Sequence, residues 1–380
     1  MGRSADVLII GLGAMGSAAA AWLAERGRRV IAFDAFTPPH AWGSSHGRSR
    51  IYRYAYWEDP RYVHLLLRGR ELWQKLERDS GVTLLHRTGG LVIGPSDGQV
   101  VPRSAESARE FELPYEVLMA ADIERRWPVF AVAPHMMGLL EQDAGYVIPE
   151  LCIAQQMRVA HEHGAELRCN EPVISWEARE GSVTVRTASG NWSADRLIVA
   201  AGPWSPRLLR DLGLPLRVTR QVVFWFRPQG GLDAFRPDRL PVYLFESEPG
   251  EAVLYGFPLT GADEEGVKVA LHGSDEVCTP ESCDRAIHTD DERRIRERLA
   301  ATLPSLAGRL VDAATCLYTM TPDEHFIVGA HPEHANVLVA AGFSGHGFKF
   351  APVIGEALGE LAVNGGSTVD LSMFAPGRFG

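Results

Sequence analysis

The stretch from Cys316 to Phe350 concentrates residue types that can do chemistry. It contains a cysteine, two glycine-flanked turns, a histidine at position 346 and a lysine at position 349, a combination that packing alone would not select. A cysteine can act as a reactive, bond-forming group. Taken alone, however, Cys316 would more often be a small buried hydrophobic residue, and Lys349 could equally lie on the surface.

Three further basic residues are candidates, each with a simpler structural reading. Lys268 lies in the run GVKVALH, in which alternate residues point to opposite faces of a strand. Without further context this pattern favours a strand with a solvated polar face. Arg50 and Arg53, in SRIYRYAY, could form surface ion pairs.

Two histidine pairs resemble metal ligands only superficially. His161 and His163 lie two residues apart on a predicted helix and point in different directions. We interpret this pair, and the pair His331 and His334, as surface residues, and His325 as structural. The sequence predicts no metal site.

The N-terminal region predicts a nucleotide-binding unit. The apolar run Val7–Ile10 predicts a buried strand, GLGAMG follows at 11–16, and helical spacing continues until Gly27. A second strand, Val30–Phe33, ends in Asp34. The glycines permit a tight turn and close approach of a pyrophosphate to the helix N-terminus. Asp34 is placed to accept hydrogen bonds from an adenosine ribose, so we favour cofactor binding over a purely structural turn.

These residues must be positioned by the rest of the chain. Helices are predicted at 60–80, 150–163 and 290–303, and strands at 165–169, in a hairpin that begins at 183–187, and at 196–201 before a Gly-Pro-Trp-Ser turn. The order hairpin, buried strand and glycine turn is typical of the FAD-binding subclass of the Rossmann-like fold. From Val218 to about Leu310, four strand-like runs separated by Pro/Gly turns predict an antiparallel sheet.

The predicted fold class is therefore α/β, or α+β over the whole chain. We expect a discontinuous FAD-binding Rossmann-like domain formed by residues 1–85, 144–217 and 322–380. Residues 86–143 and 218–321 are expected to form an antiparallel β-sheet substrate domain. A length of 380 residues suits two or three domains.

Composition excludes some partners. A net charge of −10, with no stripe of Lys and Arg, disfavours nucleic acid. The N-terminal apolar run is a short strand rather than a signal-peptide core, and no run approaches a membrane span, so we expect no membrane association. Five scattered cysteines form neither a disulfide framework nor a zinc spacing, which fits a reducing cytoplasm.

From Val7 to its C-terminus the chain resembles the monomeric sarcosine oxidase family, which includes N-methyltryptophan oxidase and the pipecolate/sarcosine oxidases. The motifs that carry the resemblance are GLGAMGS at 11–17, GSSHGRSRIYR at 43–53, YGFP at 255–258, GVKVALH at 266–272, CLYTMTPDEHFIVG at 316–329 and GFSGHGFKF at 342–350. The resemblance implies a monomeric FAD enzyme that oxidises the C–N bond of a secondary amino acid to an imine. Oxygen is the expected electron acceptor and hydrogen peroxide the expected product.

The resemblance also assigns expected roles to residues. Cys316 matches the cysteine that bonds the 8α-methyl carbon of the flavin, and Lys268 matches the lysine near flavin N5 that promotes reaction with oxygen. Arg53 and Lys349 match the pair that grips the substrate carboxylate. Further expected active-site residues are Arg50 over the flavin ring and Tyr255, His272 and Tyr318 in the substrate cavity. The expected cofactor contacts are Gly11, Gly13, Ala14, Met15, Gly16, Asp34, Ser44, His46, Ser49, Arg50, Val173, Ala201, Gly202, Trp204, Cys316, Gly342, Phe343, Gly345, His346, Gly347 and Lys349.

The resemblance leaves the preferred substrate open. Bacterial sarcosine and methyltryptophan enzymes usually read GSHHGDTR, whereas this chain reads GSSHGRSR at 43–50, closer to the pipecolate/sarcosine branch. Sarcosine or another N-methyl amino acid, L-pipecolate or another cyclic imino acid, and N-methyl-L-tryptophan remain alternatives. A dehydrogenase with a different electron acceptor, against which Lys268 argues, and a catalytically silent flavin-binding protein are the other candidates. In the expected mechanism, Arg50, Lys268 and, if protonated, His272 keep the substrate amine neutral.

Overall fold

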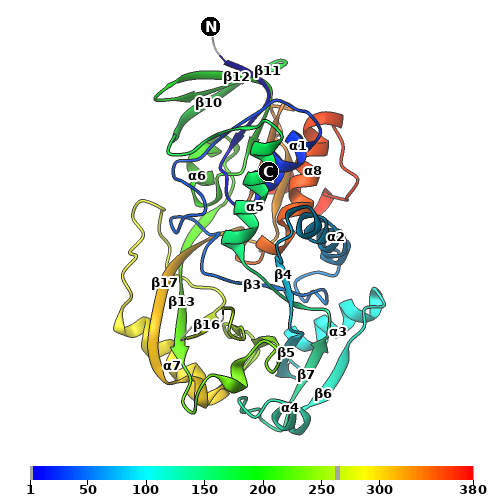
Figure 1. The fold of residues 1–380 in the computed structure, drawn as a ribbon, viewed down its shortest axis with the longest axis vertical. Helices are drawn as coiled ribbons and strands as arrows, with labels where there is room; N and C mark the ends of the chain where they lie inside the picture. Colours follow the sequence, from blue (N-terminus) through cyan, green and yellow to red (C-terminus); the bar gives the residue numbers. More distant parts are fainter. Residues whose placement is uncertain (1–2, 262–265, 380) are drawn as a thin grey trace.

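The computed structural model describes residues 3–261 and 266–379, and within them two large sheets organise the fold. In Figure 1 the first sheet lies in the upper half beside α1, α5 and α8, and the second in the lower half. The first sheet runs in the order β10 (Val173–Arg179), β11 (Ser182–Thr187), β12 (Gly190–Val199), β1 (Arg3–Ile10), β2 (Val30–Phe33) and β9 (Glu166–Arg168), with β19 (Val337–Ala341) on β12 and β18 (Ile327–Ala330) on β19.

The predicted βαβ unit forms at the centre of the first sheet. β1 is parallel to both β12 and β2, so the side chains of its second half, residues 7–10, are covered on both faces, and this half is wholly apolar. Helix α1 (Ala14–Glu25) follows the glycine loop and ends just before Gly27, whose φ is +71°. Helix α1 belongs to an apolar cluster that also includes residues of α2 (Tyr62–Ser80), α5 (Pro149–Glu162) and α8 (Ala351–Asn364).

The second sheet is antiparallel except for one pair, β14–β5. Its order is β17 (Arg309–Met320), β13 (Arg217–Arg227), β16 (Val267–Leu271), β15 (Leu254–Gly256), β14 (Val242–Phe245), β5 (Gly90–Pro95), β7 (Met136–Glu141) and β6 (Glu116–Met119). Helix α7 (Thr289–Thr302) contributes Ile295 and Leu299 to the core beneath it. The other helices of this half are α3 (Val100–Glu110) and α4 (Ala120–Arg126).

Smaller elements complete the chain. A three-stranded sheet is formed by β3 (Arg50–Tyr52), β8 (Gly145–Val147) and β4 (Leu85–Arg87), and α6 spans Ser205–Leu208. Single 3-10 turns lie at Gly202–Trp204, Arg210–Leu212, Asp233–Phe235, Pro304–Leu306, Phe348–Phe350, Ser372–Phe374 and Pro376–Phe379. In the described part of the chain, no helix has both the length and the apolar character needed to cross a bilayer.

The predicted fold class is confirmed, with two corrections. The hairpin's return strand and the run that begins at Arg196 form one continuous strand, β12, which ends at Val199: its first half pairs with β11, and from Trp192 to Val199 it lies beside β1. His331 is buried rather than exposed: its Nε2 lies 3.1 Å from Asp211 Oδ2 and its ring packs on Trp176. His161 and His163 are exposed, as predicted.

Candidate active site

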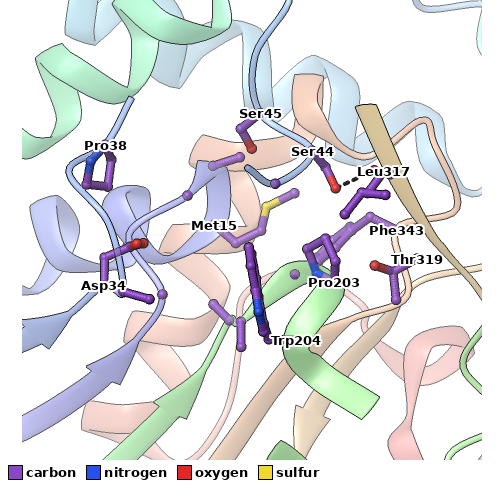
Figure 2. A pocket seen from close by; sticks show the side chains of 18 of the residues that line it. Met15, Asp34, Pro38, Ser44, Ser45, Pro203, Trp204, Leu317, Thr319 and Phe343 are labelled. Atoms are coloured by element: carbon purple, nitrogen blue, oxygen red, sulfur yellow. Dashed lines mark hydrogen bonds between the residues drawn. The ribbon is translucent and has the colours of Figure 1, made fainter. Parts of the chain in front are cut away.

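A cavity of about 330 Å³ opens where β1, β2 and β12 end. Parallel strands present their carboxyl ends at the same edge of a sheet, which is where nucleotides bind in this architecture. In Figure 2, Met15 and Trp204 lie near the middle of the view, with Asp34 at one side and Phe343 and Leu317 at the other.

The glycine loop leaves no room for side chains. Gly11 has a φ of +95°, and a Cβ atom on it would lie 2.4 Å from the carbonyl oxygen of Ala200. A Cβ atom on Gly16 would lie 1.8 Å from the Gly11 carbonyl oxygen. The loop can therefore turn tightly only with glycine at both positions, and Gly11 and Gly13 present backbone rather than side chains to the cavity.

The donors and acceptors around the loop fit a dinucleotide. Asp34 accepts hydrogen bonds from the backbone N–H groups of Leu12 (2.8 Å) and Phe36 (2.9 Å). A carboxylate has about four acceptor positions, so it can still accept from a ribose hydroxyl. Helix α1 has no side-chain cap at Gly13 and no acid in its first turn, so its N-terminal N–H groups can meet a phosphate.

Most of the expected cofactor contacts surround this cavity. The residues that line it are Gly11, Gly13, Ala14, Met15, Asp34, Ser44, Arg50, Val173, Ala201, Gly202, Trp204, Gly342, Phe343, Gly345 and Gly347. Cys316, His346 and Lys349 line a neighbouring cavity instead. Gly16, His46 and Ser49 line neither of the two, although they belong to the loops that form the walls.

The neighbouring cavity has a volume of about 80 Å³ and brings together the residues expected to bind substrate. Arg50, Tyr318, Gly345 and Phe348 line both cavities, so the two adjoin. The expected substrate-binding and cavity residues Arg53, Tyr255, His272 and Lys349 all line the smaller one.

Arg53 already has a carboxylate partner in the protein. Its Nη2 donates to both carboxylate oxygens of Glu58, at 2.7 and 2.6 Å, and its Nη1 donates to the carbonyl oxygen of Ala55 at 2.9 Å. Glu141 fixes that turn by accepting hydrogen bonds from the N–H groups of Tyr54 (2.9 Å) and Ala55 (2.8 Å). The guanidinium is thus rigidly held and paired.

Lys349 is a buried amine whose ammonium form is only weakly favoured. Its Nζ donates to the Tyr56 hydroxyl (3.2 Å) and to the carbonyl oxygen of His346 (2.9 Å). Burial, reinforced by the positive charge of Arg53, lowers the pKa of Lys349 to about 7, although Glu58 opposes the shift. A bound carboxylate would favour its protonated form.

The His346 side chain fixes the Tyr56 hydroxyl that Lys349 contacts. Its Nε2 lies 3.0 Å from the carbonyl oxygen of Glu324, which assigns the ring proton to Nε2. Nδ1 then accepts the hydrogen bond from the Tyr56 hydroxyl at 2.7 Å. Burial lowers the pKa of His346 to about 3, so the ring is neutral at pH 7.

Cys316 lines the smaller cavity beside Arg50, which lines both. It is on β17, 2% exposed, with its Sγ 3.8 Å from Arg50 Nη2 and 3.6 Å from the carbonyl oxygen of Ser44. Arg50 Nη2 also donates to the Ser44 carbonyl at 2.8 Å. The Ser44 hydroxyl donates to the Leu317 carbonyl at 2.5 Å, the contact drawn in Figure 2.

The solvated-face interpretation of the strand GVKVALH is wrong. Lys268 is 1% exposed, and its Nζ donates to the carbonyl oxygens of Gly47 (2.6 Å) and Ser49 (2.8 Å). The Ser49 carbonyl also accepts from Arg50 Nη1 at 2.7 Å, so one oxygen joins two cations. Lys268 lines neither cavity, but it shares the Ser49 carbonyl oxygen with Arg50, which lines both.

His272 is neutral, which corrects the idea that it could act as a cation. Burial lowers its pKa to about 4. Its Nδ1 lies 3.4 Å from the hydroxyl of Tyr318. The Tyr318 ring in turn packs on Gly345, where a Cβ atom would lie 2.3 Å from the ring. His272 and Tyr318 therefore form an uncharged part of the wall of the smaller cavity, whose cationic part is formed by Arg50, Arg53 and Lys349.

Several cavity residues were not identified from the sequence. Glu58 is the most consequential, and nothing in WEDP at 57–60 marks its side chain as the partner of Arg53. The others in the smaller cavity include Trp57, Gln221, Leu244, Val253 and Phe257. Within the described residues, no group of three or more His, Cys, Asp or Glu side chains could hold a metal ion.

Comparison with known proteins agrees with this geometry. The profile of the family described as FAD dependent oxidoreductase (DAO) matches residues 6–361. The chain is 43% identical over 379 residues to monomeric sarcosine oxidase from Streptomyces avermitilis, covering 100% of this chain and 98% of the relative. It is 35% identical over 376 residues to N-methyl-L-tryptophan oxidase from Salmonella agona, covering 98% and 99%. Among solved structures, the open form of NikD, an unusual amino acid oxidase essential for nikkomycin biosynthesis, matches with a TM-score of 0.87 and 27% identity, covering 98% of both chains.

Proposed function

Because the chain belongs to the FAD-dependent oxidoreductase family, on the branch of sarcosine oxidase and N-methyl-L-tryptophan oxidase, we propose that it oxidises sarcosine or a similar small N-methyl amino acid and reduces oxygen to hydrogen peroxide. It is an FAD-dependent amine oxidase. The observation that carries the substrate proposal is that Arg53 and Lys349 both line the small cavity, which adjoins the larger one that fits a dinucleotide (the dinucleotide cavity). Two cations there suit the carboxylate of an amino acid.

The residues of the larger cavity hold the cofactor in this proposal. The bare glycine loop and the N-terminus of α1 would meet the pyrophosphate, and Asp34 the ribose. Bound FAD would supply the acceptor for the two electrons of the amine and their transfer to oxygen. Cys316 would tether it through sulfur, which its place in the smaller cavity, beside the Arg50 side chain that lines both cavities, supports.

The protein's own groups orient the substrate. Arg53 and Lys349 would fix the carboxylate, and this anchoring directs the C–N bond toward the wall shared with the larger cavity. The smaller cavity is lined by three basic side chains, Arg50, Arg53 and Lys349, and by one acid, Glu58. Their field disfavours an ammonium group, so the substrate amine would lose its proton on binding.

The size of the cavity favours a small side chain. At about 80 Å³ it is far smaller than cavities that enclose drug-sized ligands. Trp57, Leu244 and Val253 give it apolar walls. We therefore propose sarcosine ahead of N-methyl-L-tryptophan, with L-pipecolate as the alternative.

The organisation of the chain extends the proposal. We propose that residues 1–85, 144–217 and 322–380 form the FAD domain and that 86–143 and 218–321 form the substrate domain, which the separation of the two large sheets supports. A monomer is proposed by analogy with the relatives named monomeric sarcosine oxidase. Five free cysteines favour a reducing compartment such as the cytoplasm.

The experiment that tests the activity measures oxygen uptake and peroxide release together. Sarcosine, N-methyl-L-tryptophan, L-pipecolate and L-proline are each supplied to the purified holoenzyme. We expect one peroxide per oxygen consumed, with the highest kcat/KM for sarcosine. Oxidation of these amines with an artificial acceptor but without oxygen uptake would instead identify a dehydrogenase, and no oxidation with either acceptor a silent flavin protein.

The tether has its own test. Acid precipitation of the wild-type protein should leave the yellow chromophore in the pellet, because a thioether survives denaturation. Cys316→Ala should release all FAD into the supernatant, whereas Cys169→Ala, a change at another free cysteine, should retain it. Flavin that stays with the Cys316→Ala pellet contradicts the tether.

A further inference from the structure

The segment between β16 and α7 contacts both walls of the dinucleotide cavity. Glu281 lines the cavity and accepts a hydrogen bond from Trp204 Nε1 at 3.0 Å; Trp204 is the large ring in the cavity in Figure 2. Arg285 donates to the carbonyl oxygens of Ala41 (3.2 Å) and Trp42 (2.8 Å), just before the loop that lines the other wall. Any chemistry on this segment would act beside the cofactor.

Two cysteines of this segment are brought together by one tight turn. The N–H of Cys278 donates to the Val218 carbonyl at 2.9 Å, which fixes the start of the turn to β13. The N–H of Cys283 donates to the Thr279 carbonyl at 2.9 Å, and the N–H of Thr279 donates to the Ser282 hydroxyl at 3.0 Å. The turn brings the two side chains close enough to interact; the Cys283 thiol lies 3.6 Å from the carbonyl oxygen of Asp284, and both residues are partly exposed.

Neither packing nor metal binding accounts for this pair. Structural free cysteines are usually buried, whereas both of these reach solvent. A zinc site would need more ligands, and no cluster of three or more potential ligands exists among the residues the structure describes. Two neighbouring thiols that are open to solvent are the arrangement from which a disulfide forms.

We propose that Cys278 and Cys283 are a redox-active pair that hydrogen peroxide converts into an intramolecular disulfide. The sulfur of Cys283 attacks one peroxide oxygen, the O–O bond breaks, and the leaving hydroxide takes up a proton to give water and a sulfenic acid. The sulfur of Cys278 then attacks the Cys283 sulfur, and a second water leaves as the S–S bond forms. Two thiols are oxidised and one peroxide is reduced to two waters.

The order of attack follows from the surroundings of the two thiols. Burial, together with the interaction with Cys283, raises the pKa of Cys278 to about 12. Cys278 therefore forms its thiolate less readily, so the first attack on peroxide is assigned to Cys283, and Cys278 gives up its proton as it attacks the sulfenic acid. The resulting bond would lock the turn that carries Glu281.

The oxidant would be the product of the proposed oxidase reaction, so the physiological meaning of the pair rests on that function. The chemical test does not rest on that function, because peroxide is added directly to the purified holoenzyme without any amine substrate. Failure of the pair to oxidise and failure of the enzyme to make peroxide are thus separate results.

The experiment maps thiols after peroxide treatment, catalase quenching, alkylation and trypsin digestion. Cleavage after Lys268 and Arg285 yields one peptide, 269–285, that contains both cysteines. We expect this peptide to become two hydrogens lighter and to resist alkylation until a reductant is added, while Cys169 stays alkylatable. In Cys278→Ser the sulfenic acid on Cys283 should persist and be trapped by dimedone. In Cys283→Ser, Cys278 should remain alkylatable.

Three results would overturn the proposal. Both cysteines could stay alkylatable at peroxide concentrations that oxidise Cys169. Each could be converted to a sulfinic acid without an S–S bond, or either could pair with another cysteine of the chain. All three are read from the wild-type protein, so the outcome does not depend on the folding of a variant.

Discussion

Glu58 occupies the guanidinium of Arg53 with two hydrogen bonds, 2.7 and 2.6 Å long, inside the cavity proposed for the substrate. Arg53 has only one further contact among the hydrogen bonds described, to the Ala55 carbonyl. A substrate carboxylate must therefore share or displace the Glu58 carboxylate. We therefore expect Glu58 to weaken the binding of a carboxylate in this cavity, and this relationship leads to the first prediction.

Glu58→Gln should bind carboxylates more tightly. The substitution removes a negative charge that opposes the ligand while keeping a hydrogen-bond acceptor for Arg53. We expect the dissociation constant of acetate, measured by flavin absorbance titration, to fall on the order of tenfold, about 1.4 kcal/mol. Glu71→Gln, an exposed change on α2, should leave it unchanged. Equal or weaker acetate binding by Glu58→Gln would show that Glu58 does not compete with the ligand.

Acetate affinity should depend on pH through Lys349. Only the ammonium form attracts a carboxylate, and the pKa of Lys349 is lowered to about 7 in the free protein. Affinity should therefore be highest below pH 7 and fall by up to about tenfold per pH unit above it, until the pKa of the complex is reached. Lys349→Met should bind weakly with no such slope. A slope that survives in Lys349→Met assigns the titration to another group.

The lowered pKa of Lys349 also makes the stability of the protein depend on pH, in the direction opposite to that of acetate affinity. Between pH 7 and the ordinary pKa of 10.5, the unfolded chain holds a proton at Lys349 that the folded chain has lost. The contribution of this group to the free energy of unfolding therefore rises with pH across that window. Urea unfolding of wild type and Lys349→Met over pH 7–10 isolates this contribution, since the rise in unfolding free energy with pH that comes from Lys349 should appear only in wild type.

Lys268→Met should impair the reaction with oxygen far more than oxidation of the amine. Lys268 is a fixed cation that shares the Ser49 carbonyl with Arg50, and such a charge would stabilise the superoxide formed in the first electron transfer to oxygen. We expect oxygen uptake to slow by roughly 10²- to 10³-fold, with anaerobic bleaching by sarcosine nearly unchanged. Lys75→Met, at an exposed lysine, is the control. Equal slowing of both half-reactions removes this role.

Gly345→Ala should destabilise the fold and displace Tyr318. Position 345 has a φ of +80°, and a Cβ atom there would lie 2.3 Å from the Tyr318 ring. The combined backbone and steric cost is about 2–5 kcal/mol. Gly365→Ala, with a similar φ of +74° and nothing within 4 Å, should cost only about 1–2 kcal/mol. Equal losses in urea unfolding would mean that the contact with Tyr318 is unimportant.

Local patterns were enough to predict the fold class. The glycine loop, the apolar run before it and the helix after it are neighbours in sequence, so their geometry is set by short-range sterics and periodicity. Helices α2, α5 and α7 likewise begin and end within two residues of their predicted bounds. The parallel β14–β5 pairing was not predicted, because it joins segments about 150 residues apart whose own sequences carry no register signal.

The candidate site was predictable in its members but less so in their contacts. The alternation in GVKVALH is the same whether its polar face meets water or protein, so it could not reveal that Lys268 is buried against two carbonyls. His331 is buried because Asp211 and Trp176 reach it from distant parts of the chain. Glu58 was missed for the same reason: its pairing with Arg53 depends on how a turn folds back.

The most direct test of the account is anaerobic bleaching of the protein-bound flavin by sarcosine compared with dimethylamine, which has the N-methyl group but no carboxylate. We predict rapid, saturable bleaching by sarcosine and at least about a hundredfold slower bleaching by dimethylamine, with the difference lost in Arg53→Met combined with Lys349→Met. Equal bleaching by both amines, or none by any secondary amino acid, would contradict the claim that two buried cations select an amino acid by its carboxylate.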